Sequence, residues 1–417
     1  MVQLTKNNTL KEEKRLSVSQ ALKLIEKKFH SVASKEYITI DSVNNRYLAK
    51  DIISKINIPP ANNTAVDGVA FKYSDLKKSS QNFLKLDGRI IAGSRKIVLG
   101  KNKAVKIFTG AIMPRGADTV VMLEDVKIDK NENVYFPIGI KKGMNVRHKG
   151  EDVKIKKKIL NKGQFLRPQD IAMLAATGNK RVLVYKKINI AVFSNGDELT
   201  EPKNKLSKGK IYDANRYMII SFLKKMEMNI LDLGIITDSK EKIEKLIKKA
   251  SIKCDLIISS GGMSQGEEDY IHRIIRENGN LYIWQLAVKP GRPFGIGKIY
   301  SKPFIGLPGN PAAAFVTFLL IAMPVISLLA SGLVYKLKSY SVTSSFTHKK
   351  KKGRQEYLRG IIYKKNNKIY TKKYFKEGAG LISSLVWSEG LIEIPSKISS
   401  IKPGDKVSFL PLNEFFY

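Results

Sequence analysis

The chain has 417 residues, of which 43% are hydrophobic and 27% are charged. These values are ordinary for folded proteins, and they exclude a disordered or fibrous chain. The length is too great for one hydrophobic core and predicts about two to four domains. The single cysteine, Cys254, excludes a disulfide framework and a cysteine-based zinc site, and it suits the reducing cytoplasm.

The net charge of +37 is the unusual property of this sequence. Lysine and arginine together number 74, against 37 acidic residues, and they are spread along the whole chain. Specific nucleic-acid binders instead concentrate basic residues, arginine above all, in one stripe. We therefore expect a compositional bias and no specific nucleic-acid site, with a polyanion-binding surface as the alternative.

One apolar stretch, residues 312–334, carries no charge over 23 residues and is long enough to span a bilayer. Pro324 interrupts it, and Asn310-Pro311 begins it as a helix cap followed by proline at the first helical position. We expect a buried core helix, with a membrane segment as the alternative. Residues 1–14 lack the apolar core of a signal peptide, so we expect a cytoplasmic protein without a membrane anchor.

The first half of the chain predicts helices on either side of a β-rich segment. Residues 17–29 have the apolar spacing of an amphipathic helix that begins at a serine cap. From about residue 60 to 146, short apolar runs separated by Gly, Asn and Asp predict a small β domain. Residues 166–178 predict a helix that begins near Pro168 and ends at Gly178.

The second half alternates between strands and helices. Short apolar runs bounded by turns lie at residues 188–193, 230–236, 255–260 and 303–307. Helical segments such as 240–250 separate them, and this alternation predicts a parallel, doubly wound sheet over residues 187–333. Residues 334–417 become strand-rich again and predict a further small β domain.

Two strand ends carry loops suited to anions. In open α/β sheets, ligands bind beyond the carboxyl ends of the strands. A predicted strand runs into residues 260–266, where glycines let backbone N–H groups approach an anion and a following helix adds its dipole. A purely structural turn is the alternative for this loop and for the turn that follows the strand at 303–307. The candidate substrate-binding residues of the two loops are Ser260, Gly261, Gly262, Ser264, Pro308, Gly309 and Asn310.

Charged side chains follow other strand ends. Glu198, Asp213 and Asp269 lie on loops at the predicted sheet edge, and hard oxygen ligands of this kind favour Mg²⁺. Each acid taken singly is more often a helix cap or a solvated charge. Lys289 and Arg292 lie on a turn that Pro290 and Pro293 stiffen, which predicts an oxyanion site or, alternatively, a basic surface turn.

Short motifs typical of one protein family follow one another along nearly the whole chain, at residues 62–70, 109–118, 124–125, 146–152, 194–199, 212–216, 260–269, 289–293, 307–311, 354–360 and 390–392. They resemble those of the MoeA family, the molybdopterin molybdenumtransferases, which includes the E-domain of gephyrin. The departures are Val69 for a usual Tyr, Arg292 for a frequent Lys, lysines at 156–158 for a turn glycine, and no histidine in the segment 378–380.

The resemblance implies a multidomain α/β plus β fold. Its parts are an elongated linking domain (1–54 and 148–186), a β-rich second domain (55–147), a doubly wound MoCF-type molybdopterin-binding domain (187–333) and a small C-terminal β-barrel domain (334–417). It also implies a homodimer whose cleft lies between the α/β domain of one subunit and the second domain of the other.

The implied activity is insertion of molybdate into adenylylated molybdopterin, with Mg²⁺ as cofactor and AMP released. A molybdopterin adenylyltransferase is the implied upstream partner, and molybdoenzyme maturation factors are possible recipients of the product. The catalytic residues that the resemblance implies are Asp67, Asp152, Lys289 and Arg292. Its further substrate-binding residues are Thr109 and Arg147, and its metal ligands are Glu198, Asp213 and Asp269.

Two other functions stay open from the sequence. The same fold can serve as a scaffold that binds molybdopterin without turnover, although the retained acids at 198, 213 and 269 argue against this. A nucleic-acid binder is the other, and it would resist elution from heparin or DNA at high salt. The sequence does not distinguish molybdate from tungstate, because the two oxyanions are nearly alike in size and charge.

Overall fold

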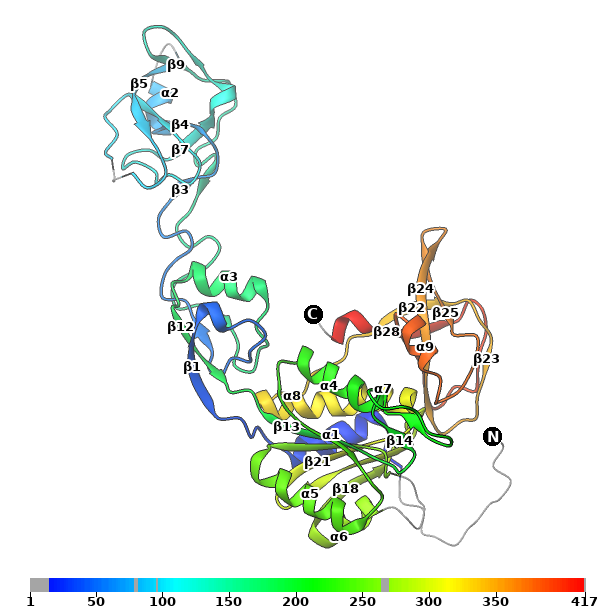
Figure 1. Ribbon diagram of the computed structural model, residues 1–417. Helices are drawn as coiled ribbons and strands as arrows, with labels where there is room; N and C mark the ends of the chain where they lie inside the picture. Colours follow the sequence, from blue (N-terminus) through cyan, green and yellow to red (C-terminus); the bar gives the residue numbers. More distant parts are fainter. Residues whose placement is uncertain (1–14, 79–81, 95–96, 264–269, 416–417) are drawn as a thin grey trace.

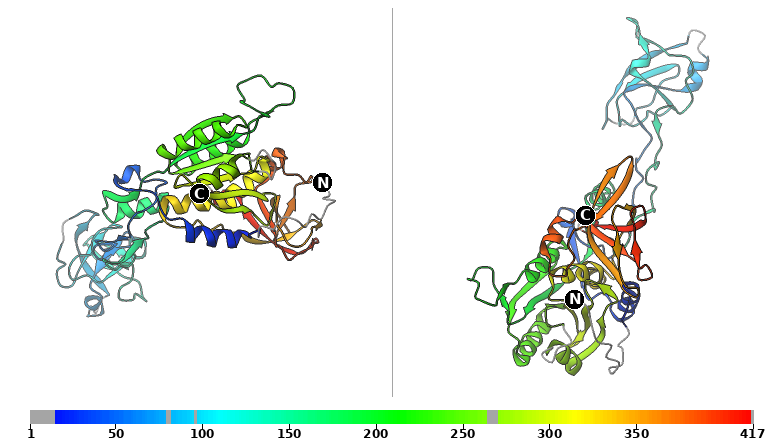
Figure 2. Two further views of the ribbon diagram at one scale, coloured as in Figure 1. Left: turned by 90° about the horizontal axis from the view of Figure 1, so that it is seen from below. Right: turned by 90° about the vertical axis from the view of Figure 1, so that its right-hand side faces the viewer.

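The structure, a computed structural model, describes residues 15–415 except 79–81, 95–96 and 264–269. Figure 1 shows an elongated molecule in which the β-rich second domain lies at the end of a narrow arm. The α/β domain and the C-terminal β domain lie side by side at the other end, and both views in Figure 2 agree with this arrangement. The chain therefore has the four parts that its sequence predicts.

The α/β domain contains a six-stranded sheet. Its strand order is β16 (Asn229–Ile236), β13 (Asn189–Asn195), β17 (Leu256–Ser260), β21 (Lys302–Leu307), β20 (Pro293–Ile299) and β18 (Gly279–Gln285). The first four strands are parallel to one another. β20 runs antiparallel to β21, and β18, antiparallel to β20, runs in the direction of the first four again. The sequence predicts a parallel sheet, and the reversed strand β20 is the departure from it. Tyr300 and Ser301, both with positive φ, join β20 to β21 by a two-residue turn, and a hairpin of that kind is antiparallel.

Helices cover both faces of this sheet, so the doubly wound architecture is confirmed. On one face lie α1 (Val18–Lys28), α4 (Asn215–Lys225) and the long helix that follows β21; on the other lie α5 (Lys240–Lys253) and α6 (Tyr270–Asn278). Ser17 caps α1, as the sequence predicts, and Gln20 completes a capping box with it. Ala21 and Ile25 of α1 are buried in the α/β core, although the predicted linking domain begins at residue 1.

The apolar stretch forms one long interrupted helix. It consists of α7 (Pro311–Thr317), a π-helical turn (Phe318–Ala322) and α8 (Met323–Ser331). Its length and composition would suffice to cross a membrane, but it is entirely buried inside the protein, as predicted for a core helix. Pro324 lacks an N–H group and would clash with the carbonyl four residues earlier, so we attribute the wide turn before it to this proline.

The second domain is built on a six-stranded sheet and confirms the β-rich prediction. The strand order is β7 (Thr119–Met122), β4 (Gly68–Phe71), β6 (Lys103–Ile107), β5 (Phe83–Ile90), β9 (Asn133–Tyr135) and β8 (Lys127–Ile128). Small apolar cores lie on either side, and α2 (Tyr73–Lys78) adds Leu76 to one of them. β3 (Asn63–Thr64) and β10 (Val146–Arg147) pair where the chain enters and leaves the domain.

The linking domain joins segments from both sides of the second domain. β1 (Lys35–Thr39) pairs with β12 (Arg181–Tyr185), and β2 (Ile52–Ile53) pairs with β11 (Lys158–Leu160). α3 (Pro168–Ala176) begins with proline, and Gly178 follows it with a φ of +74°, as the sequence predicts. Lys156 has a φ of +68°, which explains why a glycine would suit this turn better.

The C-terminal domain is a closed five-stranded barrel. The strands around it are β24 (Gln355–Lys365), β25 (Lys368–Lys373), β22 (Tyr340–Ser344), β28 (Lys406–Pro411) and β26 (Gly390–Ile394), and β26 pairs again with β24. A short helix, α9 (Ile382–Trp387), and the pair β23 (His348–Lys349) and β27 (Ser400–Ile401) complete it. β19 (Val288–Lys289) of the α/β domain pairs in parallel with β24 and joins the two domains.

Candidate active site

A pocket of about 900 Å³ lies between the carboxyl ends of β13, β17 and β21 and the wall of the C-terminal barrel. The structure brings together many of the predicted site residues here. Those that line the pocket are Glu198, Asp213, Ser260, Gly261, Gly262, Lys289, Arg292, Pro308, Gly309 and Asn310. The strand-end loops therefore meet at one place, as expected for the edge of an open α/β sheet.

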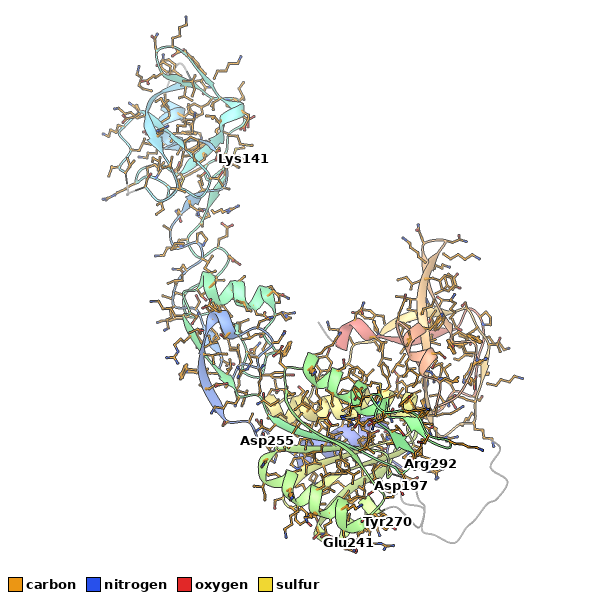
Figure 3. All side chains as sticks on the ribbon, viewed as in Figure 1. Lys141, Asp197, Glu241, Asp255, Tyr270 and Arg292 are labelled. Carbon is orange, nitrogen blue, oxygen red and sulfur yellow. The ribbon has the colours of Figure 1, made fainter. Side chains whose placement is uncertain are left out.

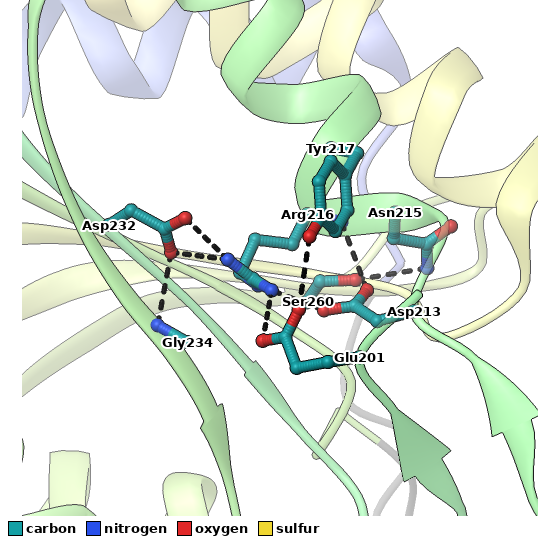
Figure 4. A network of polar contacts seen from close by, with 8 residues as sticks. All are labelled: Glu201, Asp213, Asn215, Arg216, Tyr217, Asp232, Gly234 and Ser260. Atoms are coloured by element: carbon teal, nitrogen blue, oxygen red, sulfur yellow. Dashed lines mark hydrogen bonds and ion pairs between the residues drawn. The ribbon is translucent and has the colours of Figure 1, made fainter. Parts of the chain in front are cut away.

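The buried amide of Asn215 ties three of these loops together. Asn215 follows β15 (Ile211–Tyr212), which pairs with β14 (Leu199–Thr200). Its Nδ2 atom donates to Ser260 Oγ at 3.0 Å and to the Gly309 carbonyl at 2.7 Å. Figure 4 shows the bond to Ser260. Because Ser260 accepts this bond, its own hydroxyl proton has no acceptor among the described residues and can be donated to a ligand.

The carboxylate of Asp213, a predicted metal ligand, already accepts hydrogen bonds from Arg216. Its Oδ2 atom accepts from Arg216 Nε at 2.9 Å, and its Oδ1 atom accepts from the Arg216 backbone N–H at 3.2 Å. Arg216 also binds Asp232 and Glu201, each at 2.5 Å, as Figure 4 shows. Burial opposes protonation of Arg216, but its bonds to Asp232 and Asp213 outweigh this and raise its pKa.

The glycine loop after β17 needs its glycines for packing. Gly261 has a φ of +88°, and a Cβ atom there would lie 2.3 Å from the Asn195 carbonyl oxygen. The Gly261 N–H donates to the Leu307 carbonyl at 3.1 Å, so it is not one of the donors that an anion would meet. Gly262, with a φ of +65°, lines the pocket beside it. Ser264 and Asp269, which were predicted for the same loop, lie outside the described residues.

The cationic turn joins the two domains that form the pocket. Lys289 pairs through its backbone with Glu356 of the barrel, and its Nζ atom lies 3.4 Å from Glu356 Oε1. Arg292 Nε donates to Gln285 Oε1 at 3.3 Å. Burial, followed by the charges of Arg15 and Arg354, lowers the pKa of Arg292. Figure 3 shows Arg292 on the side of the α/β domain that faces away from the arm.

The barrel wall supplies cations that the sequence motifs alone did not single out. Arg359 lines the pocket, is 6% exposed, and donates to Ser384 Oγ and the Gly378 carbonyl at 3.0 Å each. Burial lowers its pKa, against a smaller opposing effect of the charge of Glu377. A guanidinium beside a pocket can form strong, charge-assisted hydrogen bonds to an anion. Arg359 lies within the sequence motif at residues 354–360, and this position was the one indication in the sequence that it could belong to the site.

The remaining predicted residues lie elsewhere on this chain. Asp67, Thr109, Arg147 and Asp152 are exposed and do not line the pocket; the first three belong to the second domain at the far end of the arm (Figure 1). Asp67 Oδ1 accepts from the backbone N–H of Thr109 at 2.7 Å and from its hydroxyl at 2.5 Å. These hydrogen bonds lower the pKa of Asp67. Asp67 and Thr109 thus form a prearranged pair on an open surface.

The described carboxylates of the pocket do not form a metal-binding cluster. Among the described residues, no three histidine, cysteine or acidic side chains group closely enough to hold a metal ion. Glu198 is exposed in the pocket, whereas Asp213 is bound to Arg216. The described side chains by themselves therefore do not fit a complete Mg²⁺ site.

Comparison with known proteins identifies the family of the chain. The family model of the MoeA N-terminal region (domain I and II) matches residues 16–178. A model described as a probable molybdopterin binding domain matches residues 191–327, and the MoeA C-terminal region (domain IV) matches residues 342–412. Together these regions cover all four domains of the structure.

Relatives agree with these matches over most of the chain. The molybdopterin molybdenumtransferase of Haemophilus influenzae is 35% identical over 381 residues, which are 91% of this chain and 94% of that protein. The enzyme of the same name from Nostoc sp. is 34% identical over 307 residues, 72% of this chain and 70% of that one. A MoeA crystal structure from Pyrococcus horikoshii OT3 matches with a TM-score of 0.80, at 28% identity, over 95% of this chain and all of that one. The chain therefore belongs to the MoeA family of molybdopterin molybdenumtransferases.

Proposed function

We propose that the pocket is the site where this transferase inserts molybdate into adenylylated molybdopterin and releases AMP. Both substrates are anions at neutral pH, and a cationic pocket attracts them. The convergence of Lys289, Arg292 and Arg359 on the pocket formed by the strand-end loops carries the proposal. Cations from two domains thereby line one pocket of about 900 Å³.

Each of these side chains has a role in the proposed reaction. A guanidinium offers paired N–H donors that match phosphate or molybdate oxygens, so Arg292 and Arg359 would bind and orient the oxyanions. Lys289 would add a compact positive charge at the same pocket. Ser260 would donate its hydroxyl proton to a substrate oxygen, because its Oγ atom already accepts a hydrogen bond from Asn215. These contacts neutralise the charge of the bound substrate oxyanions.

We further propose that Mg²⁺ takes part and that Glu198, Asp213 and Asp269 hold it. A carboxylate has about four lone-pair sites, so Asp213 retains acceptor capacity beyond its two bonds to Arg216. When bound, Mg²⁺ withdraws charge from phosphoryl oxygens. The proposed role of Asp213 is secondary to that of Glu198, because Arg216 holds the Asp213 carboxylate in the protein interior.

We also propose that the active protein is a homodimer with shared sites. Asp67 and Thr109 form a prearranged polar pair on the second domain, far along the arm from the pocket of their own chain (Figure 1). A second copy that presents this pair, with Arg147 and Asp152, to the pocket would complete the site. Asp67 would then be catalytic, and Thr109 would hold its carboxylate.

The proposed reaction belongs to the cytoplasm and needs partner enzymes. Cys254 is the one cysteine and is buried and unpaired, which suits a reducing compartment. An adenylyltransferase must supply the adenylylated substrate, and molybdoenzyme maturation factors would receive the product.

The experiment is to incubate the protein with adenylylated molybdopterin, Mg²⁺ and molybdate and to measure AMP. We expect AMP release that depends on both Mg²⁺ and molybdate. Tight binding of adenylylated molybdopterin without AMP release would instead identify a scaffold of the same fold. Retention on heparin at high salt without either property would favour the nucleic-acid alternative.

A further inference from the structure

A buried histidine lies between two carboxylates behind the barrel wall of the pocket. His348 of β23 is 3% exposed, and its Nε2 atom lies 2.9 Å from Glu356 Oε2. Its Nδ1 atom lies 3.3 Å from Glu377 Oε1. Lys373 Nζ is 3.4 Å from the same nitrogen and 3.0 Å from Glu377. His348 itself does not line the pocket, but all three of its partners do.

Stability alone does not explain this arrangement. Two ionisable side chains in a barrel interior lose their hydration, and well-packed apolar residues in their place are often as stable or more so. His348 and Glu356 have side-chain exposures of only 2% and 4%. A functional explanation therefore has to come from Glu356, the member of the pair that lines the pocket.

Glu356 connects His348 to the pocket, because its two carboxylate oxygens contact different residues. Oε2 contacts His348, and Oε1 lies 3.4 Å from Lys289 Nζ across the domain boundary. The backbones of Glu356 and Lys289 are also paired in the β19–β24 ladder. Burial opposes ionisation of Glu356, but the hydrogen bond from His348 and the charge of Lys289 overcome it and lower its pKa. His348 thus keeps Glu356 both charged and oriented.

We propose that His348 is a positioning residue that acts on substrate binding through Glu356 and Lys289. It holds the Glu356 carboxylate in the one orientation that anchors the Lys289 ammonium group at the pocket. The inference rests on the proposed function, since it assumes that Lys289 binds an anionic substrate. Without His348, Lys289 keeps its charge but loses its fixed place, so anions bind less tightly while the chemistry of the bound substrate is unchanged.

The test compares His348→Leu with the unmodified protein by two measurements. We expect the KM for adenylylated molybdopterin to rise about tenfold, as for loss of one charge-assisted contact, with kcat unchanged. We expect the dissociation constant for molybdate, measured by calorimetry, to rise by a similar factor. Calorimetry needs no turnover, so it still decides the inference if the proposed reaction is wrong and no AMP appears.

A double-mutant cycle distinguishes this role from a merely structural one. If His348 acts through Lys289, Lys289→Ala weakens molybdate binding less in the His348→Leu protein than in the unmodified one. His348→Gln retains an N–H donor for Glu356 and recovers part of the loss. Lys349→Ala, which alters an exposed side chain on the same strand, is the control and leaves both constants unchanged.

Three results would overturn the inference. They are an unchanged molybdate constant in His348→Leu, fully additive effects in the cycle, or a folded His348→Gln protein that binds as poorly as the Leu variant. If His348→Leu does not fold, Glu356→Gln takes its place in the cycle, since it weakens the anchor of Lys289 from the other side. Additivity of Glu356→Gln with Lys289→Ala would then contradict the proposed path.

Discussion

Asp213 and Arg216 form an ion pair in the protein interior, with 2.9 Å between Oδ2 and Nε and side-chain exposures of 1% and 3%. Arg216 also binds Glu201 and Asp232, which precede and follow it in the chain. One guanidinium therefore fixes the loop after β14, the start of α4 and strand β16. The loop that carries Asp213 and Asn215 to the pocket depends on this single cation.

Arg216→Ala should destabilise the α/β domain and abolish activity. Removal of one partner of a buried ion pair costs about 3–5 kcal/mol, because the other charges stay buried and unpaired. Urea unfolding measures this cost, and AMP release measures the activity. Arg115→Ala, which alters an exposed arginine, is the control and should change neither. A stable and active Arg216→Ala protein would show that the network does not hold the loop.

Lys289→Ala should weaken the use of adenylylated molybdopterin or molybdate by about one to two orders of magnitude, since a charge-assisted contact contributes roughly 1.5–3 kcal/mol. Stability should also fall, because buried Glu356 loses its cationic partner. Lys351→Ala, which changes an exposed lysine on a turn, is the matched control. Equal AMP release by the two variants would show that Lys289 does not bind substrate and that the turn is an ordinary basic surface turn.

Gly261→Ala should be far more harmful than Gly209→Ala. Both glycines have positive φ values, +88° and +80°, so an added Cβ atom strains the backbone by about 1–2 kcal/mol at either position. At Gly261 it would also lie 2.3 Å from the Asn195 carbonyl oxygen, whereas at Gly209 nothing lies within 4 Å. Urea unfolding and AMP release should both separate the two variants. Similar midpoints of urea unfolding for the two variants would mean that the loop after β17 shifts to accommodate the added Cβ atom without cost.

Asp67→Ala and Asp269→Ala should each be inactive, yet a mixture of the two should regain part of the activity. In a mixed dimer with shared sites, one of the two pockets holds an intact Asp67 and an intact Asp269. AMP release after subunit exchange measures the recovery, and each variant mixed with itself is the control. Proven exchange without any recovery, or a monomeric mass at micromolar concentration, would contradict the shared site.

The barrel should lose stability in acid through Glu356. Its folded pKa lies below the ordinary value of 4.5, despite the opposing effect of burial, because His348 and Lys289 favour the charged form. Ionised Glu356 therefore contributes stability above about pH 4.5, and this contribution is lost as the pH falls through the lowered pKa. Urea unfolding followed by tryptophan fluorescence, with Trp387 in the barrel, measures the dependence. Glu356→Gln should show a shallower decline between about pH 5 and pH 3 than the unmodified protein. An identical decline would exclude this group.

Local features were predictable because neighbouring residues determine them. The cap at Ser17 and the helix between Pro168 and Gly178 need only side chains and backbone within a few positions. The convergence of the loops at Ser260 and Pro308 followed from a general rule about the carboxyl ends of parallel strands. The motifs themselves identified the family, which the comparisons confirm.

Other features depend on contacts between distant segments, and only the tertiary structure decided them. Arg216 lies three residues after Asp213, but its second partner, Asp232, lies 16 residues further along the chain, and only the fold brings the two together. The path from His348 through Glu356 to Lys289 crosses two domains, and the antiparallel edge of the sheet follows from a hairpin turn. A carboxylate can bind a metal, pair with an arginine or anchor a lysine, and the sequence determines only which groups are present. Which partner each one meets is decided by the fold, because buried charges are stable only where packing brings an opposite charge within reach.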